Sequence, residues 1–342
     1  MRAAVLRGGQ LIVRETADPE PGEGELLVRT LATALCASDV HFMDHPESVE
    51  GDPRYLYDAD RDIVMGHEFV GEVVALGPGC TGDIPVGARV TSMPILLDSN
   101  GATRVIGQHP DSPGSFGELF LLTERMAREV PPGVSDDAIA IVDAFAVGEF
   151  YVRSANVQPD EIPIVLGAGA IGLSAVAALA SRGAGPIIVS DYSRERRELA
   201  LQFGAEILVD PADRHPFDVW AEVAAERGAS KEPVVIECVG APGLLQSLID
   251  VAPFRTRIYA AGGHYTGDEI SVTAASQHGV TLQFAGGPQK EDWYGTLDAV
   301  AEGRLDPTPA IGLVVGLDGL PDALDMARKS QGPPRIVVHP YE

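Results

Sequence analysis

One short segment of the chain, LCASDVH at residues 35–41, brings together four side chains that can do chemistry. They are a thiol, a hydroxyl, a carboxylate and an imidazole, supplied by Cys36, Ser38, Asp39 and His41. Such a set could bind a metal ion and handle protons. It could also be ordinary loop polarity, since a single cysteine is more often a small buried hydrophobe than a ligand. The segment alone leaves both interpretations open.

A glycine-rich segment farther along the chain, VLGAGAIGL, predicts a dinucleotide-binding turn. Its three glycines directly follow the apolar run IPIVL and open the helical pattern LSAVAALASRG. The first glycine permits a tight turn, the second lets the backbone approach a pyrophosphate at a helix N-terminus, and the third allows close packing of helix on strand. The candidate cofactor contacts are Gly167, Gly169, Ala170, Ile171 and Gly172.

The next apolar run, PIIVS, ends at Asp191, nineteen residues after Gly172. A carboxylate at this place can accept hydrogen bonds from an adenosine ribose and repels a 2′-phosphate, so the sequence favours NAD over NADP. Arg194 and Arg196 lie close enough to pair with such a phosphate, and Arg196 is therefore a further candidate cofactor contact. The alternative is a glycine turn in the same kind of fold that binds no ligand.

Two kinds of element must position these residues. Roughly the first 130 residues contain short β-type runs between Gly- and Pro-rich turns, with an aperiodic stretch at 45–62 that predicts a loop. After Pro131 the pattern becomes helical, and strands then alternate with helices. We expect an α/β chain with a mostly β domain over 1–145, a doubly wound parallel-sheet Rossmann domain over 146–286 and a return segment over 287–342.

The composition excludes several classes of protein. The 342 residues carry a formal net charge of −25, which argues against partners such as nucleic acid or an anionic membrane surface. No apolar run reaches the roughly 20 residues needed to span a bilayer, and the first residues, MRAAVLRGGQLIVRE, lack the apolar core of a secretory signal. Three cysteines are too few for a disulfide framework. We expect a cytoplasmic protein.

A second pair of candidate residues, His67 and Glu68 in MGHEFVGEV, completes a set of motifs that resembles the medium-chain, zinc-dependent alcohol and polyol dehydrogenases. LCASDVH matches the family's C-x-[ST]-D-x-H turn, and GHEFVGEV matches its G-H-E-x-x-G-x-V. GPGCTGDIPVGARV resembles the segment that leads to G-D-R-V, VLGAGAIGL matches the cofactor turn, and VVIECVG matches V-x-E-x-x-G. These motifs follow in order over nearly the whole chain. The resemblance therefore implies a GroES-like catalytic domain and an NAD-linked oxidation of alcohols.

By matching position, the resemblance implies that Cys36 and His67 bind a catalytic zinc ion. The third family ligand falls at the start of the linking helix, where polyol-type members have E-P-L-A-V. This chain has DAFAV, so Asp143 takes that place and would bind the zinc ion directly or through water. Glu68 would be an alternate or fourth ligand. Asp39 would hold the second ring nitrogen of His67 and fix its tautomer.

The resemblance also implies a path for the proton of the substrate hydroxyl. Zinc, as a Lewis acid, would lower the pKa of the alcohol, and hydride would pass to C4 of the nicotinamide. Ser38 would take the hydroxyl proton, and the family's relay would pass it through the nicotinamide ribose to His41 and then to solvent. The alternative for His41 is a simple surface histidine.

The chain departs from many members of the family in one segment. These members carry four closely spaced cysteines for a structural zinc after G-D-R-V, whereas residues 91–118 here contain no cysteine, so we expect one zinc ion per chain. Cys80 and Cys238 are expected to be packing residues, and His109 a loop residue.

The sequence indicates a class of substrate and a kind of assembly. The S-D-x-H form and the carboxylate third ligand favour secondary alcohols, polyols or sugars. Tyr55 and Tyr57 of the loop could line the pocket or cover the surface, and Phe42, Met43 and Trp293 are expected in the core. Edge-strand pairing between cofactor domains predicts a homodimer or homotetramer. Two other functions remain open: a zinc-free reductase of quinones or enones, and a non-catalytic NAD-binding protein.

Overall fold

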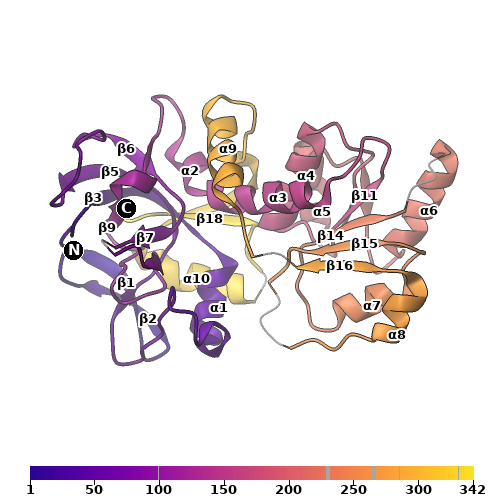
Figure 1. Cartoon of the computed structure of the whole chain (residues 1–342), viewed down its shortest axis with the longest axis horizontal. Helices are drawn as coiled ribbons and strands as arrows, with labels where there is room; N and C mark the ends of the chain where they lie inside the picture. Colours follow the sequence, from indigo (N-terminus) through magenta and orange to yellow (C-terminus); the bar gives the residue numbers. More distant parts are fainter. Residues whose placement is uncertain (99, 229–231, 264–266, 285, 330) are drawn as a thin grey trace. The chain divides into compact units, whose positions relative to one another are not determined.

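Figure 1 shows the computed structural model of the chain, which describes residues 1–98, 100–228, 232–263, 267–284, 286–329 and 331–342. The described residues form two compact units. Unit 1 contains Met1–Asp143 and Leu297–Glu342, and unit 2 contains Ala144–Thr296. The chain therefore leaves unit 1 and later returns to it. The second boundary lies at 296 where we expected 286, because the first turns of α9 (Lys290–Ala301) belong to unit 2.

Unit 1 is built mainly on antiparallel strands. Within the described residues, its largest sheet has the order β10-β6-β5-β3-β18-β17, with β9 paired to β3, and a smaller sheet has the order β2-β1-β4. A separate hairpin is formed by β7 and β8. The strands are β1 (Arg2–Arg7), β2 (Gln10–Glu15), β3 (Glu25–Leu35), β4 (Ile63–Val64), β5 (Glu68–Leu76), β6 (Arg89–Thr91), β7 (Ile95–Leu97), β8 (Thr103–Val105), β9 (Leu119–Thr123), β10 (Arg128–Glu129), β17 (Ile311–Gly316) and β18 (Arg335–His339).

Strand β3 organises unit 1, because β5, β9 and β18 all pair with it in antiparallel register. Its sequence, ELLVRTLATAL, alternates buried and half-buried side chains and then becomes continuously buried toward its end. The register places Ala34 opposite Glu68 of β5 and Leu35 opposite Ile336 of β18. Two distant parts of the chain therefore meet at the end of β3, where Cys36 follows.

The connections of unit 1 contain short helices. These are α1 (Ala37–Asp44), η1 (Pro46–Val49), η2 (Glu124–Met126), α2 (Asp136–Ala140), η4 (Thr308–Ala310), η5 (Leu317–Gly319) and α10 (Leu320–Arg328). The stretch expected as a loop contains η1 and otherwise turns. Tyr55 and Tyr57 pack against the apolar core that includes Phe42 and Met43, so these tyrosines cover the interior of unit 1.

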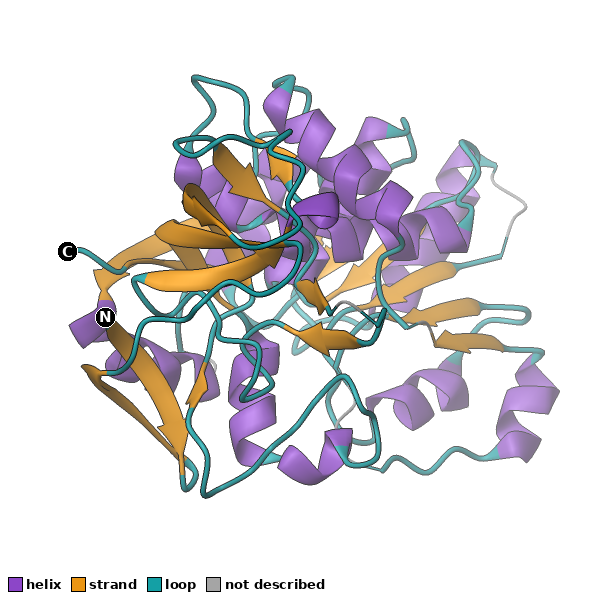
Figure 2. Cartoon of the chain, turned by 60° about the vertical axis from the view of Figure 1, so that its left-hand side comes forward, coloured by secondary structure: helices purple, strands orange, loops and turns teal. Residues whose placement is uncertain are grey.

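Unit 2 contains a parallel sheet with helices on both faces (Figures 1 and 2). Among the described residues its strand order is β13-β12-β11-β14-β15-β16, and every neighbouring pair is parallel. This is the doubly wound order of dinucleotide-binding domains, and the predicted fold class is confirmed. The strands are β11 (Pro163–Leu166), β12 (Ile188–Ser190), β13 (Ile207–Val209), β14 (Val234–Glu237), β15 (Arg257–Ala260) and β16 (Thr281–Phe284).

The helices of unit 2 follow its strands, as right-handed parallel crossovers require. They are α3 (Val142–Ala155), which begins in unit 1, α4 (Ala170–Ser181), α5 (Arg194–Ala200), η3 (Leu201–Phe203), α6 (Pro216–Arg227), α7 (Leu244–Val251), α8 (Val272–His278) and α9. Trp293 of α9 is buried, as expected for a core residue. Over the described ranges, no helix has the length and apolar content needed to cross a membrane.

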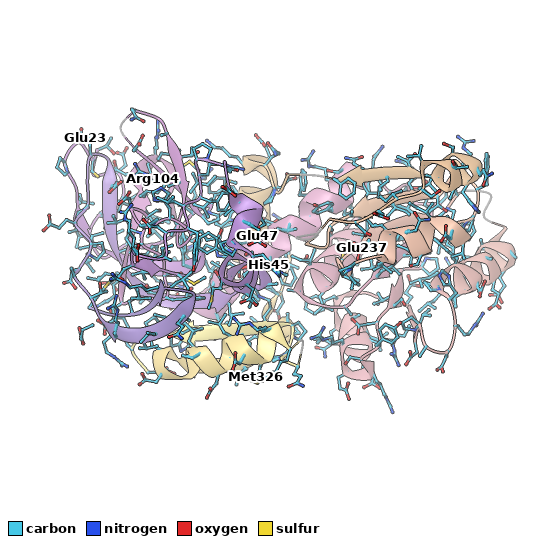
Figure 3. The ribbon with its side chains drawn as sticks, turned by 90° about the horizontal axis from the view of Figure 1, so that it is seen from below. Glu23, His45, Glu47, Arg104, Glu237 and Met326 are labelled. Carbon is cyan, nitrogen blue, oxygen red and sulfur yellow. The ribbon has the colours of Figure 1, made fainter. Side chains whose placement is uncertain are left out.

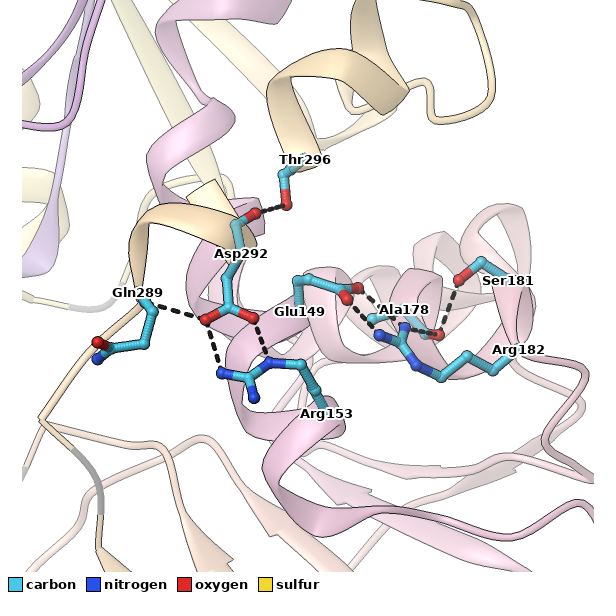
Figure 4. Close-up of polar contacts among 8 residues, drawn as sticks. All are labelled: Glu149, Arg153, Ala178, Ser181, Arg182, Gln289, Asp292 and Thr296. Carbon is cyan, nitrogen blue, oxygen red and sulfur yellow. Dashed lines mark hydrogen bonds and ion pairs between the residues drawn. The ribbon is translucent and has the colours of Figure 1, made fainter. Parts of the chain in front are cut away.

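Helices α3 and α9, which carry the chain out of unit 1 and back toward it, are joined by an ion pair inside unit 2 (Figure 4). The guanidinium of Arg153 on α3 donates two hydrogen bonds to the carboxylate of Asp292 on α9, one of them with an Nη2 to Oδ2 distance of 2.9 Å. The same carboxylate accepts the backbone N–H of Gln289 at 2.9 Å. Because the Asp292 side chain is only 1% exposed, this contact fixes the start of α9 against α3.

Candidate metal centre and cofactor turn

The metal-binding candidates of unit 1 meet at the ends of paired strands. Cys36 follows β3 and caps the N-terminus of α1, while His67 and Glu68 stand where β5 begins. Since Ala34 pairs with Glu68, the antiparallel register brings the two segments together. One ligand atom from each of Cys36, His67 and Glu68 lies within 4.8 Å of the others, and among the described residues this is the group of such side chains that could hold a metal ion.

The carboxylate of Asp39 contacts two members of this group. This carboxylate is fully buried, and Oδ1 lies 2.9 Å from Nδ1 of His67. The other oxygen, Oδ2, accepts the backbone N–H of Cys36 at 3.0 Å. One carboxylate therefore fixes both the His67 ring and the loop that carries Cys36. On the opposite side of the ring, Ser38 Oγ lies 3.1 Å from Nε2 of His67, which places the hydroxyl beside the nitrogen that would face a metal.

The charges of the group favour a deprotonated thiol. Burial alone would raise the pKa of Cys36, but the hydrogen bond and charge of His67 and the charge of Arg335 lower it below its usual value. Burial alone would lower the pKa of His67, but the charge and hydrogen bond of Asp39, with a further contribution from Cys36, raise it well above its usual range. A thiolate is the form of cysteine that binds metals.

Arg335, the first residue of β18, is a site residue that the sequence did not reveal. Its guanidinium forms an ion pair with Glu68, and both side chains are almost fully buried. Because β18 pairs with β3 beside Leu35, the arginine reaches the metal-binding group from a segment 267 residues after Glu68. Its position directly before the apolar run IVV gave no signal, because β1, β6 and β15 also begin with an arginine.

Two predicted residues stand outside this group. Asp143, the expected third ligand, lies half-buried in the first turn of α3 and is not among the three clustered ligands. His41, the expected relay residue, lies in the last turn of α1 and is half-buried. Burial and then the charge of His45 lower the pKa of His41, which keeps its ring neutral to lower pH. Among the described residues, the carboxylate that lies with Cys36 and His67 is that of Glu68, the alternate or fourth ligand of the sequence analysis.

The glycine turn of unit 2 has the geometry that its three glycines require. Gly167 adopts a φ of +86° directly after β11, a conformation that glycine reaches without strain. A Cβ atom on Gly172 would lie 1.8 Å from the carbonyl oxygen of Gly167, so no larger residue fits. Gly169 is the N-cap of α4, and no heavy atom lies within 4 Å of its Cβ position, which leaves the N-terminus of α4 open to an anion.

Asp191 follows β12 and faces the same turn. Its Oδ2 accepts the backbone N–H of Ala168 at 2.7 Å, and its Oδ1 accepts the N–H of Ser193 at 2.8 Å. Arg197 lies beside it but pairs with Asp210 at 3.0 Å. The backbone N–H of Arg196 donates to Ser193 Oγ, in the first turn of α5. The acidic residue is thus fixed at the turn.

The other side chains singled out in the sequence, two cysteines and a histidine, have structural surroundings and lie outside the metal-binding group. Cys80 is half-buried against the apolar core of unit 1, and its thiol donates to the backbone oxygen of Glu25 at 3.3 Å. Burial raises the pKa of Cys238 well above its usual value, so this thiol stays protonated. His109 accepts the backbone N–H of Asp111 through Nδ1 at 3.0 Å, which holds its loop in a turn.

Comparison with known proteins assigns both units. Residues 22–132 match the family described as alcohol dehydrogenase GroES-like domain, and residues 170–302 match the family described as zinc-binding dehydrogenase. Among curated proteins, L-threonine 3-dehydrogenase of Klebsiella pneumoniae is 29% identical over 329 residues, which is 93% of each chain. Among solved structures, 2R,3R-butanediol dehydrogenase from Bacillus subtilis has a TM-score of 0.83 at 25% identity, with 99% of both chains covered.

A structure from Sinorhizobium meliloti solved with bound NADP has a TM-score of 0.82 at 25% identity and covers 99% of both chains. The similarities therefore extend over both units and over the whole length of the chain. They agree with the parallel sheet and glycine turn of unit 2 and with the thiol, imidazole and carboxylate gathered in unit 1. The chain therefore belongs to the medium-chain, zinc-dependent dehydrogenases, oxidoreductases that act on the CH–OH group of alcohols with a nicotinamide cofactor.

Proposed function

We propose that the protein transfers hydride between NAD and a secondary alcohol, polyol or sugar-like hydroxyl, or the matching ketone or aldehyde. The observation that supports this most is the group formed by half-buried Cys36 with buried His67 and Glu68, in which Asp39 orients His67. The names of two relatives point to L-threonine and 2R,3R-butanediol, and each of these molecules carries a secondary hydroxyl group.

The donor set fits one zinc ion per chain. Thiolate, imidazole and carboxylate are the ligands of catalytic zinc sites, and both carboxylate oxygens of Glu68 are buried without a hydrogen bond while Arg335 serves as their ion-pair partner. Cys36 and His67 would hold the ion, with Glu68 or Asp143 as the carboxylate ligand. Bound zinc supplies a Lewis acid that lowers the pKa of a substrate hydroxyl.

Three side chains would hold or transfer protons during the reaction. Asp39 holds the Nδ1 proton of His67, so that Nε2 presents a lone pair to the metal. Ser38 Oγ would take the proton that leaves the substrate hydroxyl. The proton would pass through the nicotinamide ribose to His41, and the protonated His41 would release it to solvent. Bound NAD supplies the acceptor for the hydride from the substrate carbon.

The preference for NAD rests on Asp191. Its carboxylate is held beside the glycine turn by two backbone N–H groups, where it would repel a 2′-phosphate. Of the arginines in this segment, Arg194 pairs with Glu198 of its own helix and Arg197 pairs with Asp210, while Arg196 is the candidate contact for such a phosphate. These contacts support NAD even though a relative from Sinorhizobium meliloti binds NADP. The low cysteine content, three in 342 residues, supports the cytoplasm as the compartment.

A second copy of the chain is the proposed protein partner, in a dimer or tetramer. Strand β16 ends the sheet order of unit 2, and its burial pattern is mostly exposed, whereas β13 at the opposite edge is half-buried or buried. Phe284 of β16 is 58% exposed, and Phe254 is 67% exposed. An open, partly apolar edge strand is a surface that pairs readily with an identical edge.

The decisive experiment combines metal analysis with turnover. Zinc content should be close to one per chain, and a panel of alcohols with NAD should be oxidised by the zinc-replete protein but not by the chelated protein. Cys36→Ala and His67→Ala should lose both zinc and turnover. The matched control is Cys80→Ala, a thiol in the apolar core of unit 1 outside the metal-binding group, which should keep both. Full turnover by metal-free protein would contradict the proposal.

A further inference from the structure

His41 has a histidine neighbour one helical turn away. His41 lies in the last turn of α1, and His45 is the residue that ends this helix, with its backbone N–H donating to the carbonyl oxygen of His41 at 2.7 Å. The two rings are stacked, with centroids 6.2 Å apart and planes inclined by 28°. At this spacing a charge on one ring acts directly on the other.

His45 is in turn held by Glu47. Its Nδ1 lies 3.3 Å from Oε1 of Glu47, an ion pair when the imidazole is protonated, and Figure 3 shows the two side chains next to each other. The His45 side chain is 38% exposed and that of Glu47 is 68% exposed, whereas His41 is half-buried. The three residues therefore lead from the interior of unit 1 to solvent.

The nearby carboxylate of Asp44 is paired with an arginine. Asp44 lies between the two histidines in sequence, and its carboxylate accepts two hydrogen bonds from Arg328 of α10, at 2.8 and 2.9 Å. Helix α10 packs on α1, so this ion pair joins the two helices. Burial lowers the pKa of His41 first, the charge of His45 lowers it further, and Asp44 opposes this only in part.

We propose that His45, held by Glu47, is a positioning residue that makes His41 release its proton to solvent after each oxidation. This inference rests on the proposed relay role of His41. The step itself is a simple proton transfer, in which an N–H bond of the His41 imidazolium breaks and the proton passes to water, with no change of oxidation state. A positive charge on the His45 ring disfavours a second one on the neighbouring His41 ring and so favours loss of the His41 proton.

The size of the effect follows from the distance between the rings. Two like charges 6.2 Å apart, screened as in water, shift a titration by about 0.5 pH unit, and weaker screening near the protein enlarges the shift. Replacing His45 by a neutral residue should therefore raise the pKa of His41 by about this amount.

The first test measures that pKa directly, without turnover. Histidine resonances of the full-length, ¹³C-labelled protein are titrated by NMR, and His41→Gln identifies the signal of His41. In His45→Gln and His45→Phe the midpoint of His41 should rise by about 0.5 unit, because the charge is lost. His45→Arg keeps a planar cation and should leave it as low as in the wild type. His45→Phe keeps a ring over His41, so an unchanged midpoint in that variant would overturn the inference.

The second test follows the pH dependence of alcohol oxidation with the best substrate of the panel. The acid limb of kcat/KM should move upward by about 0.5 unit in His45→Gln and return to its original place in His45→Arg. In a His41→Gln background the same change should have no effect. If His41→Gln itself leaves the pH profile unchanged, the relay role fails, while the NMR titration still decides whether His45 controls the protonation of His41.

Discussion

At the scale of single residues, Asp39 links the parts of the metal centre. Its two carboxylate oxygens fix the ring of His67 and the backbone of Cys36, and its side chain is fully buried. A buried carboxylate with both oxygens engaged holds its partners rigidly, since any movement leaves a charge unpaired. This explains why the segment LCASDVH needs its carboxylate as much as its thiol.

Asp191 is the residue on which the cofactor preference can be tested. Asp191→Gly removes the charge beside the glycine turn and should raise the ratio of kcat/KM for NADP over NAD by about tenfold, equivalent to about 1.4 kcal/mol. Asp191→Asn is the matched variant, because its amide oxygen can still accept the N–H of Ala168 while carrying no charge. Steady-state kinetics with both cofactors give the ratios. A ratio that stays at the wild-type value in both variants would show that another residue sets the preference.

The residues that the sequence revealed are those with a local pattern. Cys36 and His67 stand in short motifs, and the glycine spacing follows from backbone geometry alone. Arg335 has no such pattern, because its role comes from the pairing of β18 with β3, which sequence spacing does not encode. Glu68 stands beside His67 in the same short motif and was named as an alternate or fourth ligand, and the register of β5 with β3 brings it to Cys36.

At the scale of elements, the ion pair between α3 and α9 tests how firmly the two helices are joined (Figure 4). Arg153→Gln leaves the carboxylate of Asp292, 1% exposed, with only the N–H of Gln289, and should cost about 1 to 3 kcal/mol of unfolding free energy. The comparison is Arg182→Gln, which breaks the pair with Glu149, whose two side chains are 32% and 27% exposed, and should cost roughly 1 kcal/mol or less. Urea unfolding of both variants measures the difference, and equal losses would refute the special role of the buried Asp292 carboxylate.

Among the elements, long strands and strands in a repeated strand–helix order were predictable, and isolated short strands were not. The run that became β3 is long, as is that of β5, while the strands β11 to β15 are apolar and alternate with helical patterns, which identifies even the three-residue strands β12 and β13. Strand β4 has two residues and the hairpin β7-β8 has three in each strand, too few to show a period. Strand β16, TLQF, is mostly exposed and therefore lacks the continuous apolar character of its neighbours.

At the scale of the whole molecule, the fold class and the family followed from the order of motifs along the chain, and both are confirmed. The second boundary of unit 2 was expected at 286, whereas the compact units divide after residue 296. Helical periodicity shows that residues 290–301 form a helix, but only the contact between Asp292 and Arg153 shows that its first turns belong to unit 2. Assignment of a helix to a unit depends on packing, and packing across distant segments is absent from local sequence.

Assembly is the second property at this scale. If β16 pairs with the same strand of another copy, Phe284→Asp should place charges at that edge and shift the mass from a multiple of 36.0 kDa toward the single chain. Val86→Asp changes a residue of unit 1 with the same exposure class, 59% against 58%, and should leave the mass unchanged. Size-exclusion chromatography with light scattering reports both. A wild-type protein that is already a single chain would contradict the proposed pairing.

The return of the chain to unit 1 fixes when the metal centre can be completed during synthesis. A ribosome makes Cys36 and His67 before any of unit 2, whereas Arg335 and β18 come only after all of it. Unit 2 is contiguous and can fold as the chain emerges, while unit 1 waits for the strand that lies between β3 and β17. Until then Glu68 lacks its counter-ion, and the last residues of β3, Thr33 to Leu35, lack β18, which pairs with them. Formation of the Glu68–Arg335 ion pair is therefore a late step in the synthesis of each chain, and the largest sheet of unit 1 is incomplete until that step.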